Sequence, residues 1–208
     1  STGKPVIVGR FAYSGRGSLS SDPVMAIRIN TDGTFDSTFA QPLRSQSLVN
    51  TAYGIYGRFA ILDADDKFLL TSDRLLRFNA DGTLDSAWPA RNTGYTKEIF
   101  WICRSATSGN IYLPDLNNDT PGNVVALTAE GAPLAGFNTG GFGSTIVPET
   151  AILLNDGRVL AAGIFDHFGS TRQPGTALFG TNGLLAGDST AFHNPGVLLQ
   201  NPYAYVFQ

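Results

Sequence analysis

The stretch Asn79–Trp88, with the sequence NADGTLDSAW, follows an apolar run at Leu75–Phe78. Related stretches begin at Asn30, Thr128 and Gly180, each after an apolar run of its own. The turn glycines of the four stretches are residues 33, 82, 131 and 183, which gives spacings of 49, 49 and 52 residues. A period near 50 residues that extends over a whole chain indicates an array of one supersecondary unit.

The unit is predicted to be a pair of β-hairpins. Asp-Gly or Asn-Gly between short apolar runs favours a tight hairpin, because these residues accept the positive φ that the turn needs. Each stretch therefore predicts an apolar third strand and a fourth strand that ends in an aromatic residue, at Phe39, Trp88, Phe137 or Phe192. A preceding hairpin is clearest at 152–163 and recurs at 61–70 and 102–113. Four antiparallel strands in this order form one blade of a β-propeller.

We expect an all-β fold, a β-propeller of four blades of four antiparallel strands, in one domain over 1–208. The repeats fall at 1–46, 47–95, 96–144 and 145–195, with 196–208 as a closing segment. Residues 3–11 resemble the second strand at 157–165, and residues 202–207 have the character of a first strand. The C-terminal strand is therefore predicted to complete the first blade and close the ring, which removes exposed sheet edges.

Two alternatives for the architecture remain open at this point. The chain can contribute to a larger ring that two copies complete, in place of the monomer that we expect. A β-sandwich or a β-solenoid also fits the number of strands, but neither fits a start and a stop within one blade.

The pattern Arg28–Phe39, and again Arg77–Trp88, resembles the delta-60 repeat, a β-propeller family of large bacterial secreted and surface proteins. The match is close in these two units and loose in the last two, where Glu130 and Asn182 replace the turn aspartate and residues 133–136 disrupt the pattern. The resemblance implies the propeller fold and export to the cell surface or beyond. It carries no catalytic or ligand residues onto this chain.

Composition excludes several classes of protein. The 208 residues are 42% hydrophobic and 15% charged with a net charge of -3, which is typical of a globular domain. Three lysines in all make nucleic acid an unfavourable partner, and the absence of a long apolar run excludes membrane insertion by a helix. Cys103 is the only cysteine, so there is no disulfide framework, and we expect it to be a small buried hydrophobe.

Candidate ligand-binding residues lie in the connections between the second and third strands, which differ most among the repeats. Loops on a rigid scaffold often carry binding, and aromatic residues beside arginine can stack on and hydrogen-bond a sugar or a protein side chain. These loops supply Tyr13, Arg16, His167, Phe168 and Arg172. Long surface connections without a ligand are the alternative.

Two metal sites are conceivable. Asp115, Asn117 and Asp119 have the alternate spacing of calcium ligands, so Ca²⁺ is the one cofactor considered. The sharp-turn glycine and the twelfth-position glutamate of a calcium loop are missing, which favours a polar loop. His167 and His193 can share a metal if their loops meet, but no third ligand is evident.

The repeated acids have two readings. Asp36, Asp85 and Asp188, with the turn aspartates, can form a ring of cation ligands. The favoured alternative is that Asp-Gly builds the turn and the second aspartate bonds nearby backbone amides.

No catalytic constellation is evident, so an enzyme is not favoured. The sequence has no nucleophile elbow and no phosphate-binding glycine loop. A glycosidase needs two neighbouring carboxylates, and the predicted first strands offer only Glu98 and Glu149 near their starts.

The expected function is a non-catalytic binding module of a secreted or cell-surface bacterial protein. Its ligand is a protein or a glycan, bound on the loop face of the propeller. The alternatives are a hydrolase or lyase that acts on polysaccharide at the mouth of the channel, and a purely structural spacer.

Overall fold

The computed structural model describes the repeated core of each unit. The residues it describes are 3–11, 24–41, 60–62, 64–71, 74–89, 91–92, 101–114, 124–137, 150–163, 165, 167–168 and 170–187. Among them the secondary structure is β-strand, apart from one 3₁₀ turn, η3 (Ala64–Asp66). No helix in this part of the chain is long and apolar enough to cross a membrane.

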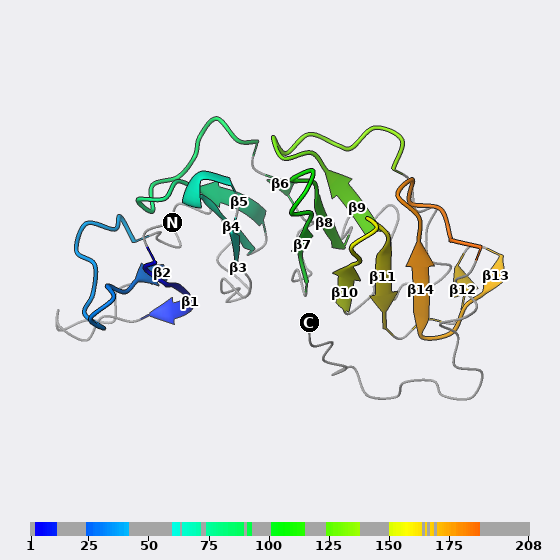
Figure 1. Ribbon diagram of the computed structural model, residues 1–208, viewed down its shortest axis with the longest axis horizontal. Coiled ribbons are helices and arrows are strands. Elements are labelled where there is room, and N and C mark those ends of the chain that lie inside the picture. Colours follow the sequence, from blue (N-terminus) through cyan, green and yellow to red (C-terminus); the bar gives the residue numbers. More distant parts are fainter. Residues whose placement is uncertain are drawn as a thin grey trace. The chain divides into compact units, whose positions relative to one another are not determined.

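Four antiparallel sheets carry the four sequence repeats (Figure 1). The first repeat forms β1 (Val6–Phe11) and β2 (Val24–Arg28). The second repeat forms a four-stranded sheet in sequential order, with strands β3 (Ala60–Leu62), β4 (Phe68–Thr71), β5 (Arg74–Phe78) and β6 (Arg91–Asn92). A four-stranded antiparallel meander is what the sequence predicts for one propeller blade, although its fourth strand lies later in the chain than expected.

The third and fourth repeats follow the same order. The third forms β7 (Cys103–Arg104), β8 (Ile111–Pro114) and β9 (Val124–Leu127). The fourth forms β10 (Thr150–Leu153), β11 (Val159–Ala162) and β14 (Thr176–Phe179). A short separate hairpin, β12 (His167–Phe168) and β13 (Thr171–Arg172), lies between β11 and β14 in sequence.

The turn that opens each repeat stretch has the same backbone geometry. Gly33 and Gly82 have φ of 85° and 87°, a left-handed conformation that glycine adopts without strain. Their amides donate to the carbonyls of Asn30 and Asn79, both at 2.9 Å. The turn aspartate then accepts from the backbone amide two residues later, so it closes an Asx turn, as expected of this sequence.

The predicted fourth strands are wrong in one respect. The residues directly after each turn make a single β-bridge, as between Phe78 and Leu84, and not a strand that ends in the aromatic residue. A second turn follows, because the amide of Trp88 bonds to the carbonyl of Asp85 at 3.2 Å. In the second repeat the fourth strand is β6, which begins three residues after Trp88 and pairs with β5.

The chain divides into two units, Ser1–Glu98 and Ile99–Gln208, and each has its own apolar core. In the first unit, side chains of the first two repeats form one cluster that includes Ala26, Phe39, Phe68 and Phe78. In the second unit, side chains of the last two repeats form a cluster that includes Trp101, Tyr112, Val159 and Phe179. Each core is therefore made between neighbouring sheets, as in a propeller.

Among the described residues β1 pairs with β2, and the predicted closing strand, 202–207, lies outside them. In the ranges that the structure describes, the chain forms repeated antiparallel sheets with almost no helix.

Candidate functional site

The candidate site is the β12–β13 hairpin of the fourth repeat, where the sequence predicts a ligand-binding loop (Figure 1). The hairpin continues from β11 and β14, at the end of the sheet opposite the repeat turns. Gly175 links the two parts, because its carbonyl accepts from the Gly163 amide at 3.0 Å and its amide donates to Phe165 at 2.8 Å. Within the expected loop, His167–Phe168 and Thr171–Arg172 thus pair as two short strands.

The hairpin places His167 directly opposite Arg172, and both side chains are exposed. Directly opposed residues in an antiparallel pair point to the same face of the ribbon. The imidazole and the guanidinium therefore lie on one face and can contact the same ligand.

Phe168 anchors the hairpin to the core of the second unit. Its ring meets the ring of Phe179 edge-on, with centroids 5.1 Å apart and planes at 64°. Because Phe168 is half-buried and packs against this cluster, its main contribution is to hold the hairpin in place. The sequence prediction that Phe168 contacts ligand is not tested by this geometry.

The base of the hairpin is held by buried groups. Gln173 is fully buried, and its Nε2 donates to the carbonyl of Thr176 at 2.7 Å. Phe165, which precedes β12, is also buried in the core. His167 and Arg172 therefore lie on a β-hairpin whose base is held by buried side chains and hydrogen bonds.

The chemistry available on this ribbon suits recognition. An arginine guanidinium presents several donors in a planar fork that matches carboxylate, sulfate or phosphate oxygens, and a neutral imidazole adds a donor and an acceptor. Within the described part of the chain no three His, Cys, Asp or Glu side chains gather as metal ligands.

Several predicted residues lie outside the described part of the chain. They are the ligand candidates Tyr13 and Arg16, the calcium candidates Asp115, Asn117 and Asp119, the histidine His193 and the acids Glu98, Glu149 and Asp188. The structure therefore brings together His167, Phe168 and Arg172 from the predicted set.

The repeated acids of the first two repeats take part in ion clusters. Asp36 is 4% exposed, and its carboxylate accepts from Lys4 Nζ at 2.9 Å and from Arg28 Nε at 2.8 Å. Its other oxygen accepts from the amide and hydroxyl of Thr38 at 3.0 and 2.6 Å. The Thr38 hydroxyl, followed by the Lys4 ammonium, lowers the pKa of Asp36 far below its usual range.

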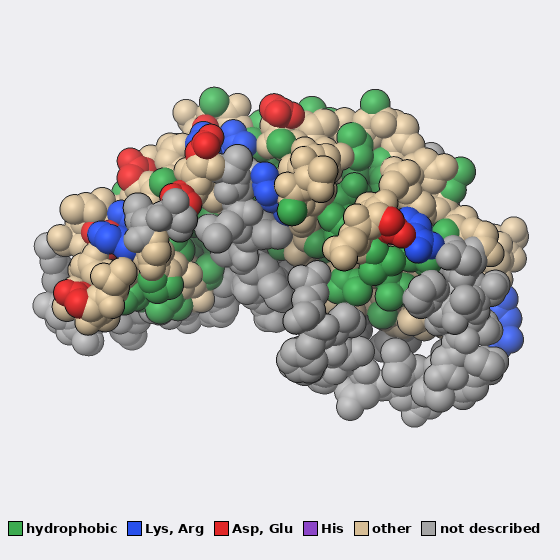
Figure 2. Space-filling view, viewed as in Figure 1, with side chains coloured by type: hydrophobic (Ala, Val, Ile, Leu, Met, Phe, Trp, Pro, Cys, Tyr) green, Lys and Arg blue, Asp and Glu red, His purple; other side chains and the backbone are tan. Residues whose placement is uncertain are grey.

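The second repeat contains the same cluster. Asp85 accepts from Lys67 Nζ at 2.9 Å and from Arg77 Nε at 3.0 Å, and also from the amide of Ala87 at 3.2 Å. The hydrogen bond from Lys67 is the largest cause that lowers the pKa of Asp85. Basic and acidic side chains accordingly lie side by side over the first unit in Figure 2.

These clusters favour the structural role of the repeated acids. Each carboxylate is used by bases and amides of its own repeat, which leaves Asp36 and Asp85 unsuited to a shared cation site. Asp32 and Asp81 likewise bond Thr34 and Thr83 within their turns. The roles of Lys4, Lys67 and the two arginines were missed, although Arg28 and Arg77 occupy the same position in the repeat.

The arginines of these clusters also lie over the repeat aromatics. Arg28 Cζ is 4.9 Å from the ring centroid of Phe39, and Arg77 Cζ is 5.8 Å from that of Trp88. Such cation–π contacts fix the aromatic ring against the ion cluster. Arg28 also donates to the carbonyl of Ala80, so the cluster of the first repeat contacts the turn of the second.

Comparison with known families gives one short match. Residues 70–87 match a model described as a domain of unknown function (DUF5122) β-propeller. The matched segment covers β5 and the Asp-Gly turn of the second repeat, with the acid Asp85 near its end. No curated protein matches the chain. Together with the repeated sheets, the match supports a β-propeller family.

Proposed function

We propose that this chain is a non-catalytic binding module that captures a protein or a glycan on the loop face of a β-propeller. The observation that carries the proposal is the β12–β13 ribbon, which presents His167 and Arg172 on one face and is anchored by Phe168. A rigid platform of this kind reduces the entropy lost when a ligand binds.

The proposed scaffold is a four-bladed ring closed by a strand added to the first blade. The support comes from strand pairing: among the described residues β1 pairs with β2 on one side, whereas the corresponding strands β4, β8 and β11 each also pair with a preceding strand. Residues 202–207 have the composition for that strand. On this model the protein is a monomer, with a ring-completing dimer as the alternative.

The proposed setting is the surface of a bacterial cell or the medium outside it. The likeness of Arg28–Phe39 and Arg77–Trp88 to the delta-60 repeat supports this proposal. A signal for export in the parent gene would test it directly.

Binding to a glycan array and to a panel of bacterial surface proteins would identify a ligand. The variant His167→Ala/Arg172→Ala should then lower affinity at least tenfold, because charged groups at the centre of an interface often contribute more than 1.4 kcal/mol.

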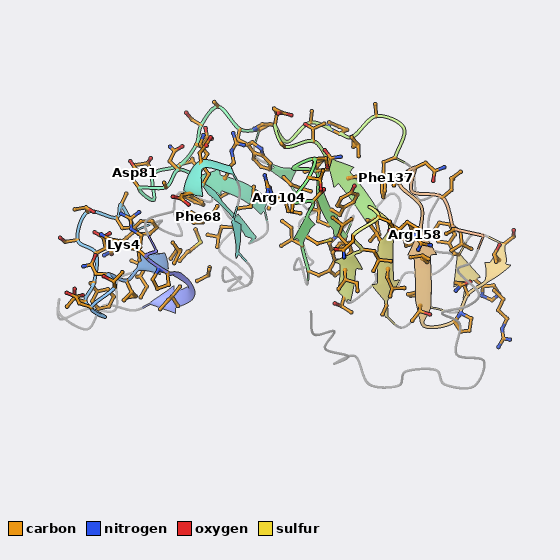
Figure 3. All side chains as sticks on the ribbon, viewed as in Figure 1. Lys4, Phe68, Asp81, Arg104, Phe137 and Arg158 are labelled. Carbon is orange, nitrogen blue, oxygen red and sulfur yellow. The ribbon has the colours of Figure 1, made fainter. Side chains whose placement is uncertain are left out.

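The matched control is Arg158→Ala. Arg158 lies at the turn between β10 and β11, at the opposite end of the same sheet, where it bonds the exposed Asp156 at 2.7 Å (Figure 3). Affinity that falls equally in this control, or that is unchanged in the double variant, would refute the proposed surface.

A further inference from the structure

The side chains of the β12–β13 hairpin alternate between the core and the solvent. In paired strands, successive residues point to opposite faces, and directly opposed residues point to the same face. Phe168 packs against the core of the second unit, where its ring meets that of Phe179. His167 and Arg172, which are opposite each other, therefore point away from the core, and both are exposed.

Arg172 differs from five other bases of the chain in having no acid beside it. The bases that the structure pairs with a carboxylate are Lys4 and Arg28 with Asp36, Lys67 and Arg77 with Asp85, and Arg158 with Asp156. Within the part of the chain that the structure describes, Arg172 forms no ion pair. Its guanidinium therefore keeps its charge and its donors for a ligand.

The exposed surface of the hairpin is polar. Besides His167 and Arg172 it carries Ser170 and Thr171, which are exposed as well. Among the described residues, the large apolar side chains that are exposed all lie in other segments, at Ile7, Phe35, Leu84 and Leu184. The centre of a protein–protein interface is usually apolar and rich in aromatic side chains, whereas the aromatic residue of this hairpin points to the core. The surface therefore favours a hydrophilic ligand over a protein.

We propose that the ligand of this hairpin is an acidic polysaccharide whose carboxylate or sulfate groups bind Arg172. The planar guanidinium donates two parallel hydrogen bonds to such a group. The His167 imidazole is within reach of a hydroxyl group on the same sugar, because the Cβ atoms of directly opposed residues are about 5 Å apart. This ligand class rests on the proposed binding function and specifies its chemistry.

The first test compares polymers that differ in charge. Dextran sulfate is paired with neutral dextran, and polygalacturonate with its methyl ester, so that the two pairs separate sulfate from carboxylate. The full chain should bind the charged member of at least one pair about fivefold more tightly than the neutral member, as measured by calorimetry. Added salt should weaken this binding, because it screens exposed charges. Equal affinity within both pairs, or no binding to any of the four polymers, would overturn the inference.

Matched variants assign the charge to Arg172. Arg172→Gln should lower the affinity for the charged polymer about fivefold. Arg158→Gln removes the same charge at the other end of the sheet, where Arg158 bonds Asp156, and it should leave the affinity unchanged. Arg172→Lys keeps the charge without the planar fork and should lose less affinity than Arg172→Gln. Equal affinity of Arg172→Gln and Arg158→Gln, or of the two Arg172 variants, would overturn the inference.

Poly-glutamate separates an acidic polysaccharide from an acidic peptide. It carries carboxylates without sugar hydroxyl groups, so the chain should bind it at least about threefold more weakly than the charged polysaccharide. His167→Ala should then weaken binding of the polysaccharide and leave that of poly-glutamate unchanged. Equal affinity for the two polymers would reject the polysaccharide as the ligand.

The proposed binding function fails on a different result. A neutral glycan or a surface protein that binds through His167 and Arg172 would leave the function in place and reject only the acidic polysaccharide. A chain that binds nothing on the glycan array or in the protein panel would reject the function itself.

Discussion

The first two repeats and the last two reach the same backbone geometry with different side chains. In the first two, Arg28 and Arg77 face the buried acids Asp36 and Asp85. At the equivalent positions the last two repeats have Ala126 with Leu134 and Leu178 with Ala186. In all four repeats the backbone amide of the second residue of the pair donates to the backbone carbonyl of the first. The N···O distances are 3.0 Å for Asp36 to Arg28, 2.9 Å for Asp85 to Arg77, 2.8 Å for Leu134 to Ala126 and 2.8 Å for Ala186 to Leu178.

The comparison shows that the same two positions of the repeat accept either an arginine–aspartate ion pair or a pair of apolar side chains. Buried ion pairs often contribute no more to stability than well-packed apolar residues of similar volume, but removing one partner is costly. The repeat fold is therefore specified by the turn and its backbone bonds, and the acid is required only where its bases are present.

The largest expected effect comes from the repeat aromatic. Phe39 is buried and stacks on Phe68 with ring centroids 6.0 Å apart, whereas Phe137 is half-buried and meets Tyr112 edge-on. Phe39→Ala should lower the free energy of unfolding by about 3–5 kcal/mol, and Phe137→Ala by about 2 kcal/mol. Urea denaturation measures both, and equal losses would show that the two units use this position alike.

The next effect comes from unbalancing an ion cluster. Asp85→Leu leaves the charges of Lys67 and Arg77 without their acid and should cost about 2–3 kcal/mol. The triple variant Lys67→Asn/Arg77→Ala/Asp85→Leu reproduces the residues of the third repeat and should recover at least half of that loss. A triple variant less stable than the single one would contradict the equivalence of the two solutions.

A smaller effect separates two glycines of similar backbone geometry. Gly82 and Gly136 have φ of 87° and 80°, so an alanine at either position should cost about 1 kcal/mol through its backbone conformation. Gly82→Ala should cost about 1 kcal/mol more, because its Cβ would meet the Phe39 ring, whereas Gly136 has open space. Equal losses in urea denaturation would refute the close contact between the first two repeats.

Acid should destabilise the first unit before the second. The lowered pKa values of Asp36 and Asp85 contribute stability above the unfolded-state pKa of about 3.9, and this contribution is lost as pH falls through that value towards the folded pKa. The last two repeats have no acid at these positions, although the exposed Asp156 also has a lowered pKa.

The two tryptophans report on the units separately. Trp88 lies in the first unit and Trp101 in the second, and both are buried. The variant Trp101→Phe keeps Trp88 and reports on the first unit, and the variant Trp88→Phe keeps Trp101 and reports on the second. As the pH is lowered, the fluorescence of Trp101→Phe should change at a higher pH than that of Trp88→Phe. A common midpoint would mean that the two units unfold together.

The turn signals predicted the repeat, its strand order and its period, because Asp-Gly constrains the backbone locally. The fourth strand was misplaced because Asp85 and Trp88 form a second turn, which depends on a bond between them and not on strand propensity. Cys103 was expected in the core. It is half-buried there, and burial raises the pKa of its thiol to about 12.

The candidate site was predicted less well than the fold. His167 and Arg172 were proposed as ligand-binding residues from the length and polarity of their loop, but their cross-strand pairing was not predicted. That pairing depends on Gly175 and on the packing of Phe168 against Phe179, which are contacts between residues that are not neighbours in the sequence. The ion clusters were missed for the same reason, since Lys4 and Asp36 are 32 residues apart.

The contact of Phe39 with Gly82 also bears on how such a chain can change its length in evolution. The amide of Ala40 bonds to the carbonyl of Asp81 at 2.7 Å, so the end of one repeat motif is fitted to the turn of the next. The turn glycines Gly33 and Gly82 are 49 residues apart. A duplicated segment of that length therefore contains one turn glycine and one aromatic end of the motif, whichever residue it begins at. Every new junction then contains the same pair, and the array can gain or lose whole repeats without a new interface having to arise.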